Sequence, residues 1–99
     1  MIEEIRHYSL HDGMLPAMLD RFKKINMVLF ERHGIELTRS WLHVDDDRMF
    51  SFAAVFADLD DRERAWAAYH NDPLFIENKE TQATIIKTIE LHVLEPHEW

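Results

Sequence analysis

The sequence predicts an α+β domain whose elements follow one another in the order β-α-β-β-α-β. Two observations predict this order. Four stretches rich in β-forming residues lack helical spacing, and apolar residues at helical spacing mark two helical regions between them. The chain has 99 residues with only two glycines and three prolines, so short loops are expected. The simplest arrangement is one four-stranded antiparallel sheet with the helices on one face, which is the ferredoxin-like fold.

The first half of the chain is expected to form a strand, a helix and a second strand. Residues 2–10 mix β-forming and charged residues and then reach the turn HDG, so they are predicted to be the first strand. The helix that follows has Pro16 in its first turn and ends at about His33, where Gly34 suits a left-handed stop. Residues 35–44 are predicted to form the second strand.

The third strand is predicted at residues 48–57, after a polar hairpin turn at 45–47. Because this strand is apolar on both sides, it is expected to be central in the sheet. A single helical layer covers one sheet face only, so an aromatic and aliphatic second face would be left uncovered. Large exposed apolar patches usually mark an interface. We therefore expect a homodimer through the sheet face, a dimeric α/β barrel that can enclose a cavity; a partly apolar monomer is the alternative.

The second helical region is expected to begin at Asp60, which is predicted to be its N-cap with Glu63 as the capping-box partner. Pro73 interrupts this helix and begins a short helix that reaches about residue 82. Residues 84–94 are predicted to form the last strand.

The composition excludes several classes of function. The net charge is −8, which opposes binding to nucleic-acid phosphates and to anionic membranes, so neither partner is expected. The absence of cysteine rules out disulfides, thiol catalysis and thiolate metal sites. The opening MIEEIRHYSL is unlike a signal peptide, and no apolar run approaches the ~20 residues that a membrane helix needs. Together these features indicate a cytoplasmic protein.

Three segments of the sequence resemble the NIPSNAP family, within the dimeric α/β-barrel superfamily. They read MIEEIRHYSLHDGMLPAMLDRF, ERHGIEL and DLDDRERAWAAYHNDPLF. The resemblance spans nearly the whole chain, as one domain over residues 1–99. The positions that carry it are Ile2, Glu4, Arg6, Tyr8, Leu10, Gly13, His33, Gly34, Ile35, Arg62, Glu63, Ala65, Trp66, Asp72 and Pro73. The resemblance implies a ferredoxin-like protomer and a barrel-forming dimer, and it implies little about chemistry.

A first group of candidate ligand-binding residues lies on the first predicted strand. Glu4, Arg6 and Tyr8 share one side of that strand because strand side chains alternate. A carboxylate, a guanidinium and a phenol in a row could orient a small carbonyl compound or acid. A structural ion pair is the alternative.

A second group consists of Trp41, His43 and His92, on the second and last predicted strands. Together with Tyr8, the two histidines could do acid–base chemistry because histidine titrates near neutrality. Ordinary hydrogen-bonded histidines, and a tryptophan in the core or an interface, are the alternatives. The seven histidines show no spacing typical of a metal site, so no metal is expected. No bound cofactor is expected either.

Two functions of different classes remain open at this point. The first is a dimer that binds a small molecule without turnover, which fits the absence of a specific catalytic motif. The second is a cofactor-independent monooxygenase or isomerase acting on a small aromatic or carbonyl compound. This second function rests on analogy with the superfamily, so the sequence does not decide whether the protein is an enzyme.

Overall fold

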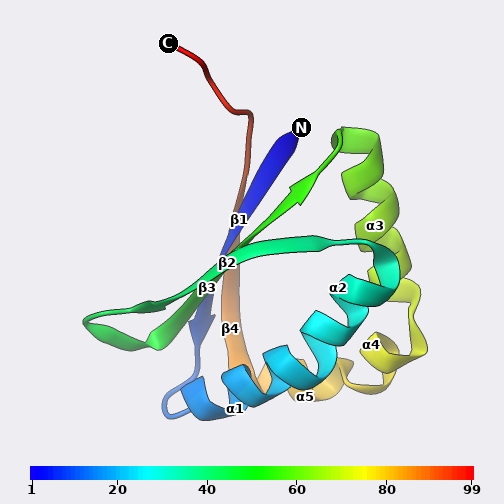
Figure 1. The fold of residues 1–99 in the computed structure, drawn as a ribbon. Helices are drawn as coiled ribbons and strands as arrows, with labels where there is room; N and C mark the ends of the chain where they lie inside the picture. Colours follow the sequence, from blue (N-terminus) through cyan, green and yellow to red (C-terminus); the bar gives the residue numbers. More distant parts are fainter.

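All helices of the protein lie on one side of a single four-stranded antiparallel sheet (Figure 1). This is seen in a computed structural model that describes residues 1–99. The strands are β1 (Ile2–Leu10), β2 (Glu36–His43), β3 (Asp46–Phe56) and β4 (Ile86–Leu94). They lie in the order β2-β3-β1-β4, so β1 and β3 are central and β2 and β4 are edges. The predicted α+β, ferredoxin-like architecture and the central third strand are confirmed.

The first helical region runs without a break but is not uniform. It consists of α1 (Leu15–Arg21), a π-helical segment η1 (Phe22–Asn26) and α2 (Met27–His33). It ends at Gly34, whose φ of 71° is the predicted left-handed stop. The π-helical segment is not predicted by the sequence, because the apolar residues on both sides of it keep ordinary helical spacing. Segments of this kind occur frequently at functional sites.

The cap of helix α3 (Leu59–Asn71) is Asp58, and the prediction of Asp60 is wrong. The Asp58 carboxylate accepts a hydrogen bond of 2.8 Å from the backbone N–H of Asp61. Sheet pairing explains the choice among these aspartates. Phe56 still pairs with β1, so the chain leaves the sheet there and Asp58 is the first aspartate free to cap.

The remaining boundaries differ from prediction by one to three residues. The single short helix expected after Pro73 is two helices, α4 (Pro73–Glu77) and α5 (Lys79–Ile85). Asn78 separates them, and its side-chain amide donates to the carbonyl of Leu74 at 2.8 Å. The β2–β3 turn consists of residues 44 and 45 rather than 45–47, because Asp46 already pairs in the sheet.

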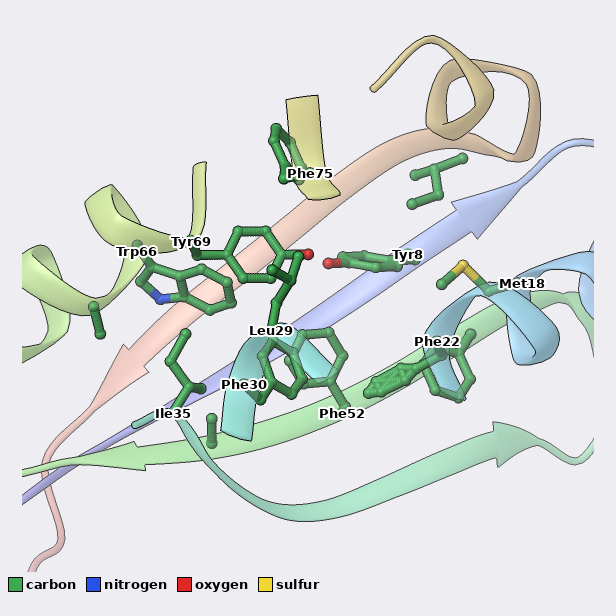
Figure 2. Close-up of a cluster of buried hydrophobic side chains, with 14 of the residues drawn as sticks. Tyr8, Met18, Phe22, Leu29, Phe30, Ile35, Phe52, Trp66, Tyr69 and Phe75 are labelled. Carbon is green, nitrogen blue, oxygen red and sulfur yellow. The ribbon is translucent and has the colours of Figure 1, made fainter. Parts of the chain in front are cut away.

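The core lies between the helices and the sheet and is strongly aromatic (Figure 2). Phe52 on β3 is 1% exposed, and its ring centre lies 5.1 Å from that of Phe22 and 5.6 Å from that of Phe30. Trp66 and Tyr69 of α3 close the cluster against Phe30, with ring centres 5.9 Å away in each case. The phenylalanines of β3 therefore face the helices.

The uncovered sheet face, called the open face below, is less aromatic than predicted. Its residues on β1 are Glu3, Ile5, His7 and Ser9, paired in register with Val55, Ala53, Ser51 and Met49 of β3. Trp41 is the one tryptophan, tyrosine or phenylalanine that the strands direct to this side. The prediction of an aromatic second face is wrong. Because β3 is apolar on both sides, the sequence does not show that its phenylalanines face the helices. Alternation alone could not tell which side faces the helices.

We expect Asp58→Ala to lower the free energy of unfolding by about 1 kcal/mol, because it removes the side-chain acceptor of the Asp61 N–H at the start of α3. The matched control is Asp60→Ala, which should change stability by less than about 0.5 kcal/mol. Urea unfolding followed by circular dichroism measures both. Equal losses in the two variants would contradict the assignment of the cap.

Candidate functional site

The sheet separates the predicted candidates into two groups on opposite faces. Glu4 and Arg6 pair in register with Ala54 and Phe52, so they point toward the helices. His92 pairs with Ile5 on the open face. The remaining candidates follow the same division: Tyr8 lies on the helical side, and Trp41 and His43 lie on the open face. A joint site of Tyr8 with the two histidines is therefore not formed.

On the helical side, Glu4 is a buried carboxylate at the centre of an ionic cluster. Its side chain is 1% exposed, and it accepts hydrogen bonds from the guanidinium groups of Arg6 and Arg62 and, at 3.0 Å, from Trp66 Nε1. The Arg6 guanidinium also lies 4.0 Å from the centre of the Trp66 ring. This geometry favours a structural ion pair that joins β1 to α3 over a ligand site.

The pKa of Glu4 reflects two opposing effects. Burial raises the pKa. The hydrogen bonds from Arg62, Arg6 and the Trp66 N–H, together with the positive charge of Arg6, lower the pKa by more than burial raises it. The net result is a pKa below the ordinary value, so Glu4 is ionised at neutral pH.

A second polar group lies deeper on the helical side, beside the π-helical segment. Figure 2 shows the hydroxyl groups of Tyr8 and Tyr69 pointing toward one another, and Tyr69 Oη accepts a hydrogen bond of 2.8 Å from Asn26. Burial raises the pKa of both tyrosines. Arg21 Nε and Asn26 Oδ1 have no hydrogen-bond partner.

The open face carries a different cluster, to which each of the four strands contributes one side chain. Ser51 of β3 is 2% exposed, and its hydroxyl lies 2.7 Å from His7 Nδ1 on β1 and 2.7 Å from His43 Nε2 on β2. His92 of β4 completes the row, with its ring centre 6.2 Å from that of His7. We call His7, Ser51 and His43 the His–Ser–His chain.

A hollow of about 300 Å³ adjoins the His–Ser–His chain. Apart from the three side chains of the His–Ser–His chain, the walls of the hollow are apolar, and no Asp, Glu, Lys or Arg lines the hollow. The lining residues are Ile5, His7, Trp41, Leu42, His43 and Ser51. The structure thus brings Trp41 and His43 together in one concave site.

Two members of this site, His7 and Ser51, are missing from the sequence-based candidates. Their meeting depends on the β1–β3 register, in which His7 lies opposite Ser51. No short-range pattern encodes that pairing. The hairpin could have pointed to Ser51, since Trp41 lies opposite it. Counting back from the expected turn at 45–47 pairs residue 44 with residue 48, and so Trp41 with Ser51.

No three His, Cys, Asp or Glu side chains of the structure are arranged to hold a metal ion. None of the helices is both long and apolar enough to cross a membrane. The hollow itself offers imidazole rings, a hydroxyl and apolar walls.

The fold and its strand order define a ferredoxin-like α+β protein. The NIPSNAP family model matches residues 3–99, and the chain belongs to the NIPSNAP family. No curated protein matches the chain.

Three solved structures illustrate the similarity. The protein Atu4242 from Agrobacterium tumefaciens is 24% identical with a TM-score of 0.89, over 100% of this chain and 96% of that chain. An uncharacterized NIPSNAP domain protein from Burkholderia xenovorans is 17% identical with a TM-score of 0.87, over 98% and 95%. SnoaB, a cofactor-independent oxygenase from Streptomyces nogalater, is 19% identical with a TM-score of 0.69, over 99% and 94%. At these identities, the likeness shows the fold alone.

We expect Glu4→Gln to lower the free energy of unfolding by about 3 kcal/mol, because it leaves two partly buried guanidinium groups without a counter-charge. Glu3→Gln is the matched control, since Glu3 is the adjacent residue on the other face and should have little effect. Urea unfolding at neutral pH gives both values.

The pH dependence provides a second check on the same variant. Because the pKa of Glu4 is lowered in the folded state, its stabilisation is complete above the ordinary glutamate pKa of about 4.3 and is lost as the pH falls through the lowered folded value. The wild-type protein should therefore lose stability in acid more steeply than Glu4→Gln. Parallel acid profiles would contradict the role given to Glu4.

Proposed function

We propose that the protein is a homodimer that binds a small molecule between its open sheet faces, at the hollow beside the His–Ser–His chain. One observation carries this proposal. On the sheet face that no helix covers, a buried serine hydroxyl is held by two histidines at the edge of an apolar hollow. Ligand sites commonly combine apolar walls with a few convergent polar groups in this way.

The charge distribution supports a partner over the open face. Where β1 and β3 pair, they direct eight side chains to that face, of which Glu3 alone is formally charged. Arg39 and Glu90 lie on the same face at its edge strands, and the chain as a whole has a net charge of −8. Depletion of charged residues is a mark of interface centres. Trp41, which is 39% exposed, adds an aromatic side chain that a second copy would cover.

The edge strand β4 exposes a further apolar surface, on the helical side of the sheet and not on the open face. Every residue from Lys87 to Leu94 is exposed, because the helical layer does not extend over this strand. Ile89, Leu91 and Val93 on its helical side are 41%, 40% and 37% exposed. An exposed edge with three apolar side chains is a site at which chains associate, so a second copy that covers it would remove this liability.

A cofactor-independent enzyme, a monooxygenase or isomerase for a small aromatic or carbonyl compound, is the second candidate function. The observation that favours it is the His–Ser–His chain itself, since two histidines beside a hollow can exchange protons with a ligand. SnoaB is described as a cofactor-independent oxygenase, and its shared fold raises this candidate by analogy only.

We expect size-exclusion chromatography with light scattering to give a particle of twice 11.9 kDa at micromolar concentration. Ile5→Lys, which places a charge at the centre of the open face, should yield single chains. The control is Ile76→Lys, which alters a residue of α4 that is 57% exposed and should leave the dimer intact. A wild-type monomer would contradict the proposed dimer.

We expect acetophenone or benzoylacetone to shift the imidazole signals of His7 and His43 in the NMR spectrum, because these rings line the hollow. His97 lies in the C-terminal tail and is the internal control. Trp41→Ala should weaken binding by removing one wall of the hollow. Shifts that are equal at His97, or absent from all three rings, would count against a ligand site here.

A further inference from the structure

We propose that His7 and His43, linked by Ser51, form a two-ended proton shuttle that interconverts the keto and enol forms of a small, uncharged aromatic carbonyl compound. This inference rests on the proposed function, because the substrate must lie in the same hollow. It adds the reaction and the role of each group. The argument starts from the number of protons that the His–Ser–His chain can hold.

The serine hydroxyl has one proton and must serve two rings. Its oxygen lies 2.7 Å from a ring nitrogen on each side, and the side chain is 2% exposed. No other hydrogen bond of this hydroxyl is present. When both imidazoles are neutral, Ser51 therefore donates its proton to one ring and accepts an N–H from the other.

The two rings consequently have opposite tautomers. A neutral imidazole carries one N–H. The ring that accepts from Ser51 keeps its proton on its outer nitrogen, and the ring that donates to Ser51 leaves its outer nitrogen bare. The outer nitrogens are His7 Nε2 and His43 Nδ1. When both rings are neutral, one of these two outer nitrogens is always an acid and the other is always a base.

This pairing of an acid with a base is what a 1,3-proton transfer requires. The base nitrogen removes a proton from the carbon next to the carbonyl, and the electron pair of that C–H bond forms the C=C bond. The carbonyl π electrons move to the oxygen, which takes the proton from the acid nitrogen. The substrate gains one proton and loses one, so the step needs no oxidant, reductant or metal.

The His–Ser–His chain returns to neutrality through Ser51. The ring that gained a proton passes its inner N–H proton to the serine oxygen, and the serine proton moves to the inner nitrogen of the other ring. Both imidazoles are then neutral with their tautomers exchanged. In this exchanged state the two outer nitrogens have swapped roles. His92, whose ring centre is 6.2 Å from that of His7 and whose side chain is 54% exposed, lies where protons can be exchanged with solvent.

The dimensions and lining of the hollow set the class of substrate. The rings of His7 and His43 both line the hollow and lie edge to face with centres 6.2 Å apart, and the transfer needs a contact of about 3 Å from each outer nitrogen to the substrate. Ile5, Trp41 and Leu42 supply apolar surface suited to an aromatic ring, and no formally charged side chain lines the hollow. These features fit an uncharged aromatic ketone or 1,3-diketone.

The test uses benzoylacetone as the substrate and the full-length protein as the catalyst. Enol formation is followed by ultraviolet absorbance, and exchange of the acidic C–H in D₂O is followed by NMR. We expect the wild-type protein to accelerate both processes over imidazole buffer of equal concentration. Ser51→Ala should reduce the acceleration by about 100-fold or more, because the two rings can no longer pass a proton between them.

Three further variants separate the shuttle from a merely structural role of Ser51. Ser51→Thr retains the hydroxyl and should keep most of the activity. His43→Gln, on the edge strand, should lose it. Ser9→Ala is the matched control, because Ser9 lies on the same face and its hydroxyl contacts only Met49 Sδ, at 3.4 Å. The dimer should persist in all of these variants.

The outcomes distinguish this inference from the proposed function. A wild-type dimer whose His7 and His43 signals shift with benzoylacetone, but which does not accelerate exchange, overturns the shuttle and leaves ligand binding in place. Equal acceleration by wild type and Ser51→Ala also overturns the shuttle. A wild-type monomer without NMR shifts overturns both.

Discussion

The antiparallel register between β1 and β3 is the constraint on which the rest of this structure depends. His7 lies opposite Ser51, and Arg6 lies opposite Phe52. Because strand side chains alternate, a slip of one residue would turn either Phe52 toward solvent or His7 toward the core, depending on which strand moved. Phe52 is almost fully buried against aromatic rings of the helical layer. Hydrophobic packing on one face thereby fixes the position of the polar cluster on the other.

The helical layer is held over the sheet by buried ionic contacts as well as by the aromatic core. Glu4 ties β1 to α3 through Arg62 and Trp66. Asp72, at the start of α4, joins the end of α2: the Leu74 amide, the His33 ring and the Arg32 guanidinium lower its pKa to about 2. These contacts place the helices over the central strands and leave β4 uncovered on both sides. The same anchoring that completes the core thus leaves an exposed apolar edge at β4.

Small residues make the open face suitable for a ligand. Ser51 and Ala53 are buried beneath their larger neighbours although no helix covers them, so the middle of this face is recessed and polar groups can line it. Three solved structures with this fold are 17% to 24% identical to the chain. A fold held in common at such distance does not define an activity. The chemistry of this protein must therefore be sought in the side chains of its own open face.

The sequence by itself determined the order of the elements, the ferredoxin-like arrangement and the central place of β3. These follow from local signals: alternation, helical spacing, and turn residues such as Gly34. It also pointed to Trp41, His43 and His92, whose shared face follows from alternation within strands and pairing between them. Only the tertiary structure decided that Glu4, Arg6 and Tyr8 face the helices, and that His7 and Ser51 complete the site. The physical reason is that β3 is apolar on both sides, so only long-range packing of its phenylalanines selects the buried face, and with it the register that brings residues 7, 43 and 51 together.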